Sequence, residues 1–152
     1  MNKTTQLKKL LLQRKALPCP GVYDALSARM VEYCGFQACQ ISGFGVSASS
    51  LGMTDASFTS LEEIVRITSN IVRAVDIPVM TDADTGYGNA VNVWWTTKRL
   101  EETGAAGMNL EDQCFPKRCG HMAGKQLISL GEMVGKIRAA VDAKRDPDFV
   151  IN

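Results

Sequence analysis

The sequence has no excess of charge of either sign. Its 17 Lys and Arg residues balance 16 Asp and Glu residues to a formal net charge of +1, and the basic residues are scattered among acidic ones. This distribution gives no electrostatic reason to expect a nucleic acid or a membrane surface as a partner. One mildly basic patch, interpreted as the solvated face of an amino-terminal helix, comprises Lys8, Lys9, Arg14 and Lys15.

Long apolar runs are also missing. No segment approaches the length of a membrane-spanning helix, and the first twenty residues lack the order of a signal peptide. The five cysteines are odd in number and irregular in spacing, which argues against a disulfide framework and favours a reducing cytosol. We therefore expect a cytoplasmic protein in which Cys19, Cys34 and Cys39 are small buried hydrophobes.

Helical and strand patterns alternate along the chain. Its 152 residues, 45% of them hydrophobic, have the length and composition of one globular domain. Helical spacing, N-capping residues (capping boxes at Ser60 and Ser129 included) and glycine stops predict helices over residues 4–15, 25–33, 61–75, 91–103 and 130–144. Apolar runs predict strands over residues 37–42, 77–81, 107–110 and 149–152, after an extended piece that ends near Tyr23. Strand separations of roughly 30 to 40 residues indicate βα units and a parallel sheet.

Polar residues close the predicted strands. Ser42 ends one strand, Asp82 and Asp84 follow the next, and Glu111 ends the third. Chemistry in parallel α/β folds gathers at the carboxyl ends of strands. Two carboxylates two positions apart point to the same side of a strand, so Asp82 and Asp84, joined by Glu111 and Asp55, are candidate ligands for a hard cation such as Mg²⁺. The alternative is that these acids cap helices or form turns.

The pentapeptide Lys117-Arg118-Cys119-Gly120-His121 is the second candidate centre. Its positive charges favour the thiolate of Cys119, or position the thiol to give a proton to a developing carbanion. The alternatives are a buried hydrophobic Cys119 and a structural role for His121, the only histidine. Cys114, Cys119 and His121 do not match a standard zinc spacing.

Two further segments have simpler interpretations. Residues 43–52 are rich in glycine and serine, and residues 42–50 are expected to form a loop whose backbone N–H groups can bind a carboxylate. This loop is neither a P-loop nor a dinucleotide fingerprint, so no nucleotide is predicted. Trp94 and Trp95 are interpreted as core and interface packing.

At these residues the sequence resembles the isocitrate lyase/phosphoenolpyruvate mutase superfamily. The matching motifs are Ser42-Gly43, Ser49-Ser50-Leu51-Gly52, Asp55, Asp82-Ala83-Asp84-Thr85-Gly86-Tyr87-Gly88, Glu111-Asp112-Gln113 and Lys117-Arg118-Cys119-Gly120-His121. The resemblance runs from Leu17 to Asn152, and its last motif is specific to the carbon–carbon lyase branch. It implies an α/β fold of the (β/α)8 TIM-type barrel family, in which this chain forms about the first half, and assembly as a homotetramer.

The resemblance also implies a reaction. A 2-hydroxy di- or tricarboxylate, of the 2-methylisocitrate or 2-alkylmalate type, would be cleaved to a 2-oxo acid and a second carboxylate. Mg²⁺, or Mn²⁺ in its place, would be held by Asp82, with Asp84, Glu111 and Asp55 acting partly through water. Cys119, on a mobile loop, would protonate the carbanion, while the loop and the substrate carboxylates are organised by Lys117, Arg118 and His121. Substrate would be bound by Ser42, Gly43 and Phe44.

Departures from the family pattern leave the substrate open. Gln40 stands where an aromatic residue is frequent, and Phe44 replaces a frequent glycine. Residues 1–152 are expected to be the amino-terminal part of one barrel domain, truncated in the fifth strand. The alternatives are an oxaloacetate decarboxylase, a phosphonomutase-type enzyme on the same scaffold, or a non-catalytic half-barrel.

Overall fold

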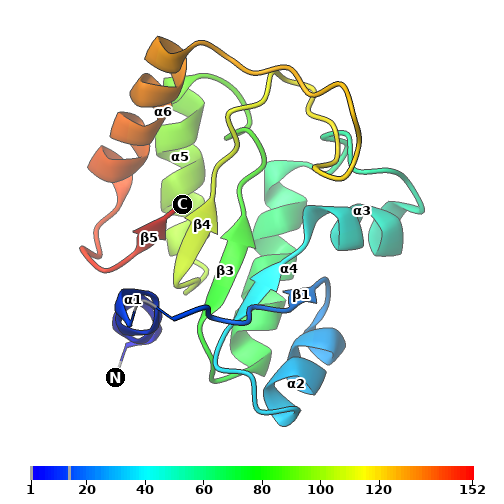
Figure 1. Cartoon of the computed structure of the whole chain (residues 1–152), viewed down its shortest axis with the longest axis vertical. Helices are drawn as coiled ribbons and strands as arrows, with labels where there is room; N and C mark the ends of the chain where they lie inside the picture. Colours follow the sequence, from blue (N-terminus) through cyan, green and yellow to red (C-terminus); the bar gives the residue numbers. More distant parts are fainter. Residues whose placement is uncertain (1, 14) are drawn as a thin grey trace.

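A five-stranded parallel sheet forms the centre of the computed structural model, which describes residues 2–13 and 15–152; Arg14 of the basic patch therefore lies outside the described residues. The strands lie side by side in chain order, as Figure 1 shows. They are β1 (Gly21–Val22), β2 (Cys39–Ile41), β3 (Val79–Asp82), β4 (Gly107–Asn109) and β5 (Val150–Ile151). The helices are α1 (Lys3–Leu12), α2 (Ala25–Tyr33), α3 (Gly43–Leu51), α4 (Leu61–Ala74), α5 (Ala90–Glu101) and α6 (Leu130–Ala143). The predicted βα alternation and parallel sheet are confirmed.

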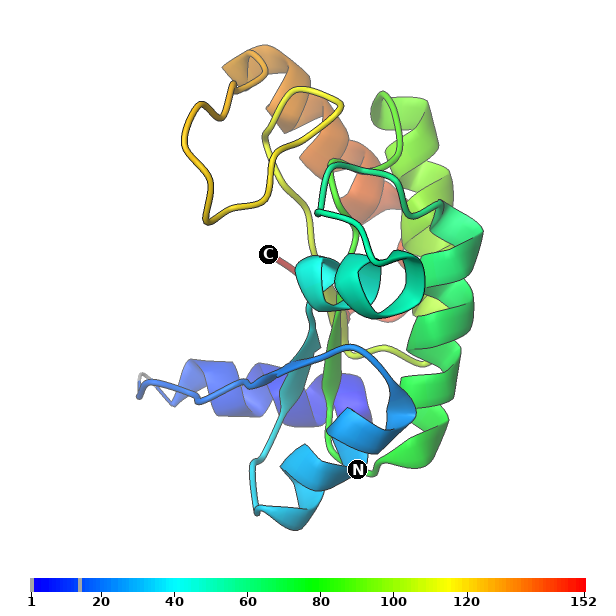
Figure 2. The same ribbon diagram turned by 90° about the vertical axis from the view of Figure 1, so that its right-hand side faces the viewer.

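The two faces of the sheet have different environments. Helices α4, α5 and α6 cover one face, and α1 lies across the amino-terminal ends of the strands (Figure 2). Along β3, Val79 and Thr81 belong to the helix-covered side, where the Thr81 hydroxyl lies 2.8 Å from that of Thr68 in α4. Met80 packs on the other side with Leu7 of α1. Because side chains alternate along a strand, Asp82 lies on the same side as Met80, at the carboxyl end of β3.

Residues 43–52 form a helix rather than the predicted loop. The hydroxyl of Ser42 accepts a hydrogen bond from the Gly45 N–H at 3.1 Å, and Gly52, with a φ of 64°, closes the other end in the left-handed conformation. Glycine and serine have weak helix propensity, which explains the prediction. The two caps and the burial of Val46 and Ser47 against the body of the protein outweigh that weakness.

Caps explain most of the other helix starts. The capping box predicted at Ser60 is present, with the Glu63 carboxylate accepting from the Ser60 N–H at 2.8 Å. At Ser129 only one half of the expected box forms, since the hydroxyl accepts from the Glu132 N–H without the reciprocal bond. The first helix ends at Leu12, three residues earlier than predicted.

The burial predicted for Cys34 is wrong, and so is the core packing predicted for Trp94 and Trp95, whose interface packing stays a prediction. Cys39 is buried as expected and Cys19 is half-buried, but Cys34 is exposed, because it caps the carboxyl end of α2. Trp94 and Trp95 are 40% and 51% exposed, so they are not core residues. Each ring instead makes a cation–π contact with a basic residue one helical turn further along α5. Lys98 Nζ lies 4.1 Å from the centroid of Trp94, and Arg99 Cζ lies 5.6 Å from that of Trp95.

Within the described residues, no helix combines the length and the apolar character needed to cross a bilayer.

Candidate active site

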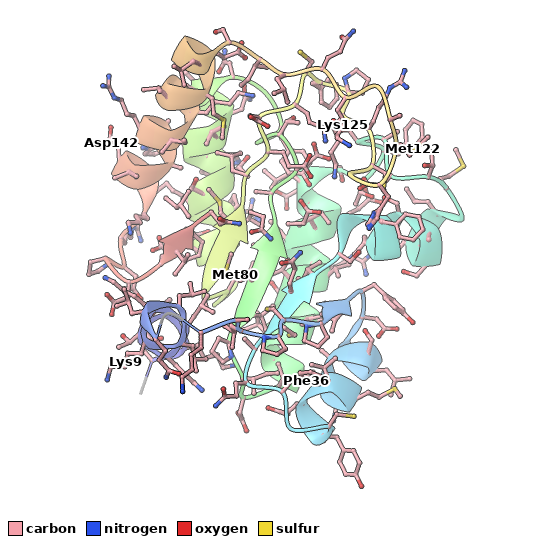
Figure 3. All side chains as sticks on the ribbon, viewed as in Figure 1. Lys9, Phe36, Met80, Met122, Lys125 and Asp142 are labelled. Carbon is pink, nitrogen blue, oxygen red and sulfur yellow. The ribbon has the colours of Figure 1, made fainter. Side chains whose placement is uncertain are left out.

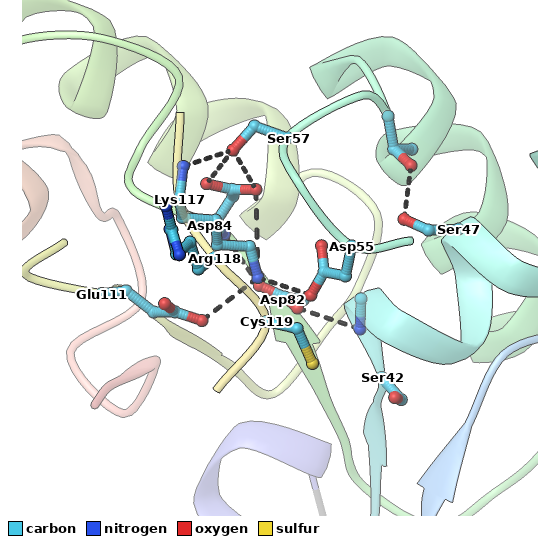
Figure 4. A network of polar contacts seen from close by, with 12 residues as sticks. Ser42, Ser47, Asp55, Ser57, Asp82, Asp84, Glu111, Lys117, Arg118 and Cys119 are labelled. Carbon is cyan, nitrogen blue, oxygen red and sulfur yellow. Dashed lines mark hydrogen bonds and ion pairs between the residues drawn. The ribbon is translucent and has the colours of Figure 1, made fainter. Parts of the chain in front are cut away.

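The predicted acids meet at the carboxyl edge of the sheet, around a buried lysine (Figure 4). Lys117 is 3% exposed, and its Nζ lies 2.9 Å from Asp55 Oδ2, 3.2 Å from Glu111 Oε1 and 4.0 Å from Asp84 Oδ2. Asp82 completes the group, which we call the carboxylate cluster: Asp55, Asp82, Asp84 and Glu111. These residues come from the segment after α3, the end of β3, the turn after it and the segment after β4. The grouping predicted from the sequence is therefore found.

Asp82 is held at the amino-terminal end of α3. Its Oδ2 accepts a hydrogen bond from the Gly43 N–H at 3.0 Å, and its Oδ1 accepts from the Asp84 N–H at 2.7 Å. A Cβ atom at Gly43 would overlap Asp82 Oδ2, so only glycine allows this approach. The first N–H groups of a helix lack partners within it and carry partial positive charge, which suits them to an anion.

Asp84 reaches the cluster through a turn and not through strand alternation, which corrects the geometry that we predicted for the Asp82/Asp84 pair. β3 ends at Asp82, and Asp84 has a φ of 50°, in the left-handed region. The carboxylate of Asp84 accepts from the Thr85 N–H at 2.6 Å and lies within hydrogen-bond distance of the Ser57 hydroxyl, at 3.1 and 3.2 Å. The Asp84 carbonyl accepts from the Glu111 N–H at 2.9 Å, which ties this turn to the end of β4.

The cluster is electrostatically unusual because so many acids are buried together. Burial raises the pKa of Asp82 to about 6, while Lys117 opposes that rise; burial likewise raises the pKa of Asp84. Burial alone would lower the pKa of Lys117, but the nearby carboxylates, Asp82 foremost, raise it above its ordinary value. Lys117 is therefore protonated, and its positive charge compensates part of the negative charge of the surrounding carboxylates.

The oxygen-only donor set of the cluster suits a hard divalent cation. Within the described part of the chain, no three Asp, Glu, His or Cys side chains are already arranged to hold a metal ion. The space among the carboxylates is taken by the ammonium of Lys117. The chemistry of these residues fits Mg²⁺ or Mn²⁺, and binding requires the ammonium to move or to share its partners.

Lys117 belongs to the long connection between β4 and α6, residues 113–128, which we call the loop. Its two ends are joined by hydrogen bonds from the Cys114 N–H to the Gln126 carbonyl and from the Ile128 N–H to the carbonyl of the preceding Asp112, at 2.8 and 2.9 Å. Figure 3 shows Met122 and Lys125 on this loop, at the carboxyl edge of the sheet.

Cys119 is buried although the loop around it is largely exposed. The side chain is 6% exposed, and its Sγ lies 3.6 Å from Nδ1 of His121. In the view of Figure 4 the thiol projects between Asp82 and Ser42. The thiol is thus carried to the site by the same loop that inserts Lys117.

The other predicted site residues lie at the margin. Arg118 is exposed, and its guanidinium donates to the Ala123 carbonyl at 3.4 Å, so the structure does not bring it to the cluster. Ser42 caps α3, next to Gly43. Phe44 is 51% exposed on the same helix.

Two residues at the site were not predicted. Gln113 is 5% exposed; its Nε2 donates to Glu111 Oε2 at 2.6 Å and to the Arg118 carbonyl at 2.9 Å, while its Oε1 accepts from the Arg118 N–H at 3.1 Å. Its position beside Glu111 in the motif was the available signal. Ser57, whose hydroxyl also accepts from the Lys117 N–H at 3.2 Å, carries no signal in the sequence.

Comparison with known proteins identifies the family to which this fold belongs. The family model described as phosphoenolpyruvate phosphomutase matches residues 7–152. The chain belongs to this family. Its sheet and helices are those of the (β/α)8-barrel members of the superfamily, of which the chain covers about half.

Named relatives include enzymes of several activities. The 2,3-dimethylmalate lyase of Eubacterium barkeri is 46% identical over 99% of this chain and 52% of the relative, and the 2-methylisocitrate lyase of Aeropyrum pernix is 46% identical over 92% of this chain and 45% of the relative. A solved structure of phosphonopyruvate hydrolase with oxalate and Mg²⁺ has a TM-score of 0.90 and 34% identity, covering 99% of this chain and 51% of that one. The chain therefore spans about half the length of the proteins it matches.

Proposed function

We propose that this chain forms the metal-binding and proton-donating half of a carbon–carbon lyase that cleaves a 2-hydroxy di- or tricarboxylate. The observation that carries the proposal is the loop, which inserts Lys117 among four acids and buries the Cys119 thiol at the same edge of the sheet. A phosphoryl-transfer site has no use for a proton-donating thiol. Of the substrate types, we favour a 2-alkylmalate, because the 2,3-dimethylmalate lyase is a relative matched over almost the whole chain, and we place 2-methylisocitrate second.

Asp82 would hold Mg²⁺ directly, and Asp84, Glu111 and Asp55 would support it through water. The bound metal ion would supply charge stabilisation for the oxygens of the 2-oxo acid. The described arrangement supports this set because its ligands are all carboxylates, and a solved family member is recorded with oxalate and Mg²⁺.

Cys119 would act as the acid. As the carbon–carbon bond breaks, the 2-hydroxyl would lose its proton to a carboxylate of the cluster, and the electron pair of the bond would pass to the carbon next to the second carboxylate, which must take a proton before release. Buried beside His121, the thiol is shielded from water and can deliver that proton to a substrate at the cluster. Gly43, at the amino-terminal end of α3, and Ser42 would face the carboxylate of the 2-oxo acid, while Lys117 and His121 would hold the loop and Arg118 and Phe44 would lie at its rim.

We also propose that the intact protein assembles as a homotetramer, as the family resemblance implies.

Conversion of four substrates by the intact natural protein, followed through the products formed, tests the activity. The substrates are 2,3-dimethylmalate, 2-methylisocitrate, oxaloacetate and phosphonopyruvate, each with Mg²⁺ and with EDTA. We expect turnover of the first or second with Mg²⁺ alone. Turnover of only oxaloacetate or phosphonopyruvate would replace the lyase with the corresponding alternative.

Substitution of Cys119 tests the proton donor. Cys119→Ser should lower turnover by a factor of about 100 or more, the usual contribution of a general acid, and leave Mn²⁺ binding intact. Cys114→Ser, a half-buried cysteine of the same loop, is the matched control and should keep its activity. Equal activity of the two variants would rule out Cys119 as the acid.

A further inference from the structure

Lys136 of α6 is buried without a carboxylate in direct contact. It is 3% exposed, and its Nζ donates to the Thr85 carbonyl at 3.0 Å, while its acidic neighbour Glu132 is half-exposed and 4.0 Å away. A buried ammonium loses most of its hydration, and a single backbone carbonyl with a distant surface acid replaces little of it. Stability of the fold alone does not explain a cation at this position.

The carbonyl that Lys136 binds lies in the turn that carries Asp84, whose N–H also donates to Asp82. This turn, residues 83–88, follows Asp82 and contains four residues with positive φ, two of which, Asp84 and Tyr87, are not glycine. Such conformations are sparsely populated and persist only where the surroundings restrain them.

The other carbonyl groups of the turn accept hydrogen bonds from neutral donors. The Gly86 N–H donates to the Ala83 carbonyl at 2.8 Å, and the Thr96 hydroxyl donates to the Gly86 carbonyl at 3.1 Å. Between these two carbonyls, that of Thr85 receives the ammonium of Lys136. A hydrogen bond from an ionised donor is stronger than one from a neutral donor. The bond from Lys136 is therefore the strongest of these three, and it acts on Thr85, the residue after Asp84.

We propose that Lys136 is a positioning residue for the metal site: its hydrogen bond to the Thr85 carbonyl holds the strained turn in the form that directs Asp82 and Asp84 into the carboxylate cluster. The proposal rests on the proposed function for the identity of the metal site. It also links the site to α6, the helix that begins directly after the loop. The segment that carries Cys119 and the turn that carries Asp84 are thereby both connected to the same helix.

The chain offers a matched control. Lys144, just after α6, donates to the carbonyls of Pro147 and Phe149 at 3.0 and 2.9 Å, the same kind of bond at the opposite end of the helix from the loop. Lys136→Met and Lys144→Met each remove one such ammonium. Only the first should affect the turn.

Two measurements on the full chain test the proposal. Amide hydrogen exchange of residues 83–88, in metal-free protein, should accelerate in Lys136→Met and stay unchanged in Lys144→Met, with β3 and β4 protected in both. The Mn²⁺ dissociation constant, measured by electron paramagnetic resonance, should rise about tenfold in Lys136→Met, as is typical when a group that orients a ligand is lost. Lys136→Arg, which keeps a cationic donor, should restore both.

The outcomes separate the two hypotheses. Lys136→Met protein with wild-type exchange in the turn would overturn the positioning role. Wild-type protein that binds no Mn²⁺ would refute the proposed function, and the exchange experiment would still decide whether Lys136 restrains the turn. If Lys136→Met does not fold, Lys136→Gln, a shorter neutral donor, takes its place with the same expected changes, and its failure to show them would equally overturn the role.

Discussion

At the scale of single residues, the ammonium of Lys117 and a divalent cation require the same oxygens. Lys117 neutralises part of a buried acidic cluster and at the same time anchors the loop, since its N–H donates to Ser57 and its Nζ contacts Asp55 and Glu111. A second cation entering the cluster meets this charge at short range. The metal and the loop must therefore influence each other.

Removing that charge should tighten metal binding. For Lys117→Met we expect the Mn²⁺ dissociation constant of the substrate-free protein to fall by at least about tenfold, because like charges about 4 Å apart repel by several kcal/mol at an effective dielectric constant of about 20. Turnover should nevertheless be lost, since the loop loses its anchor. Calorimetric titration with Mn²⁺ measures the affinity. Lys125→Met, which removes an exposed loop lysine bound to the Gly120 and Met122 carbonyls, should leave the affinity unchanged, and a weaker affinity in Lys117→Met would contradict the competition.

The affinity for metal should also depend on pH. Burial raises the pKa of Asp82 to about 6, so a proton competes with the cation below that pH and not above it. The Mn²⁺ affinity should therefore rise with pH up to about 6 and level off at higher pH. Titrations in a series of buffers at constant ionic strength check this, and an affinity independent of pH across this window would show that Asp82 is ionised throughout.

Most members of the site, though not its arrangement, could be predicted from residue types. The acids were recognisable because each follows a strand, and Cys119 because cations surround it in the sequence. The insertion of Lys117 into the cluster depends on how the loop folds back, which no local pattern encodes. The role of Ser57 likewise depends on contact with a residue 27 positions away.

At the scale of elements, strong local signals decided the correct predictions. The capping box and the apolar spacing of α4 both lie within the helix that they define, so the sequence suffices. For α3, the helix propensity is weak and the deciding contributions are contacts with distant segments, such as the 3.2 Å hydrogen bond between the Ser47 and Thr59 hydroxyls. Tertiary packing overrode propensity there, and a prediction from local pattern fails for that reason.

The cap of α4 has a measurable contribution. Ser60→Ala removes the hydroxyl that accepts from the Glu63 N–H and should lower the free energy of unfolding by about 1 kcal/mol. Ser69→Ala, in the interior of the same helix, is the control and should be neutral or stabilising, because alanine is the better helix former. Urea denaturation of both variants gives the comparison. Equal effects would mean that the cap contributes nothing specific.

At the scale of the whole molecule, the carboxylate cluster joins segments that are far apart in the chain. Asp55, Asp82 and Glu111 belong to three successive βα units, whose strands are hydrogen-bonded neighbours in the sheet. That these strands form a parallel sheet followed from their separations in the sequence. The separations did not give the extent of the fold; the family resemblance predicted about half of a barrel, and the chain spans about half the length of its relatives.

Metal binding should consequently stabilise the entire fold. A ligand present at a hundred times its dissociation constant adds about 2.7 kcal/mol to the free energy of unfolding, and each kcal/mol raises the melting temperature by about 2–4 °C in a domain of this size. We expect Mn²⁺ to raise the melting temperature by several degrees and EDTA to reverse the change. Asp82→Asn should abolish the shift, so an equal shift in that variant would place the binding elsewhere.

The loop has one more consequence, which concerns measurement. Its tip exposes Met122, 50% open to solvent, only a few residues from the buried Lys117. A cation that displaces the ammonium breaks contacts that anchor the loop on which Met122 lies. A fluorophore could be attached through Met122→Cys, in a variant that lacks the exposed thiol of Cys34. Its fluorescence would report occupancy of the carboxylate cluster, and the labelled protein would serve as a metal-ion sensor.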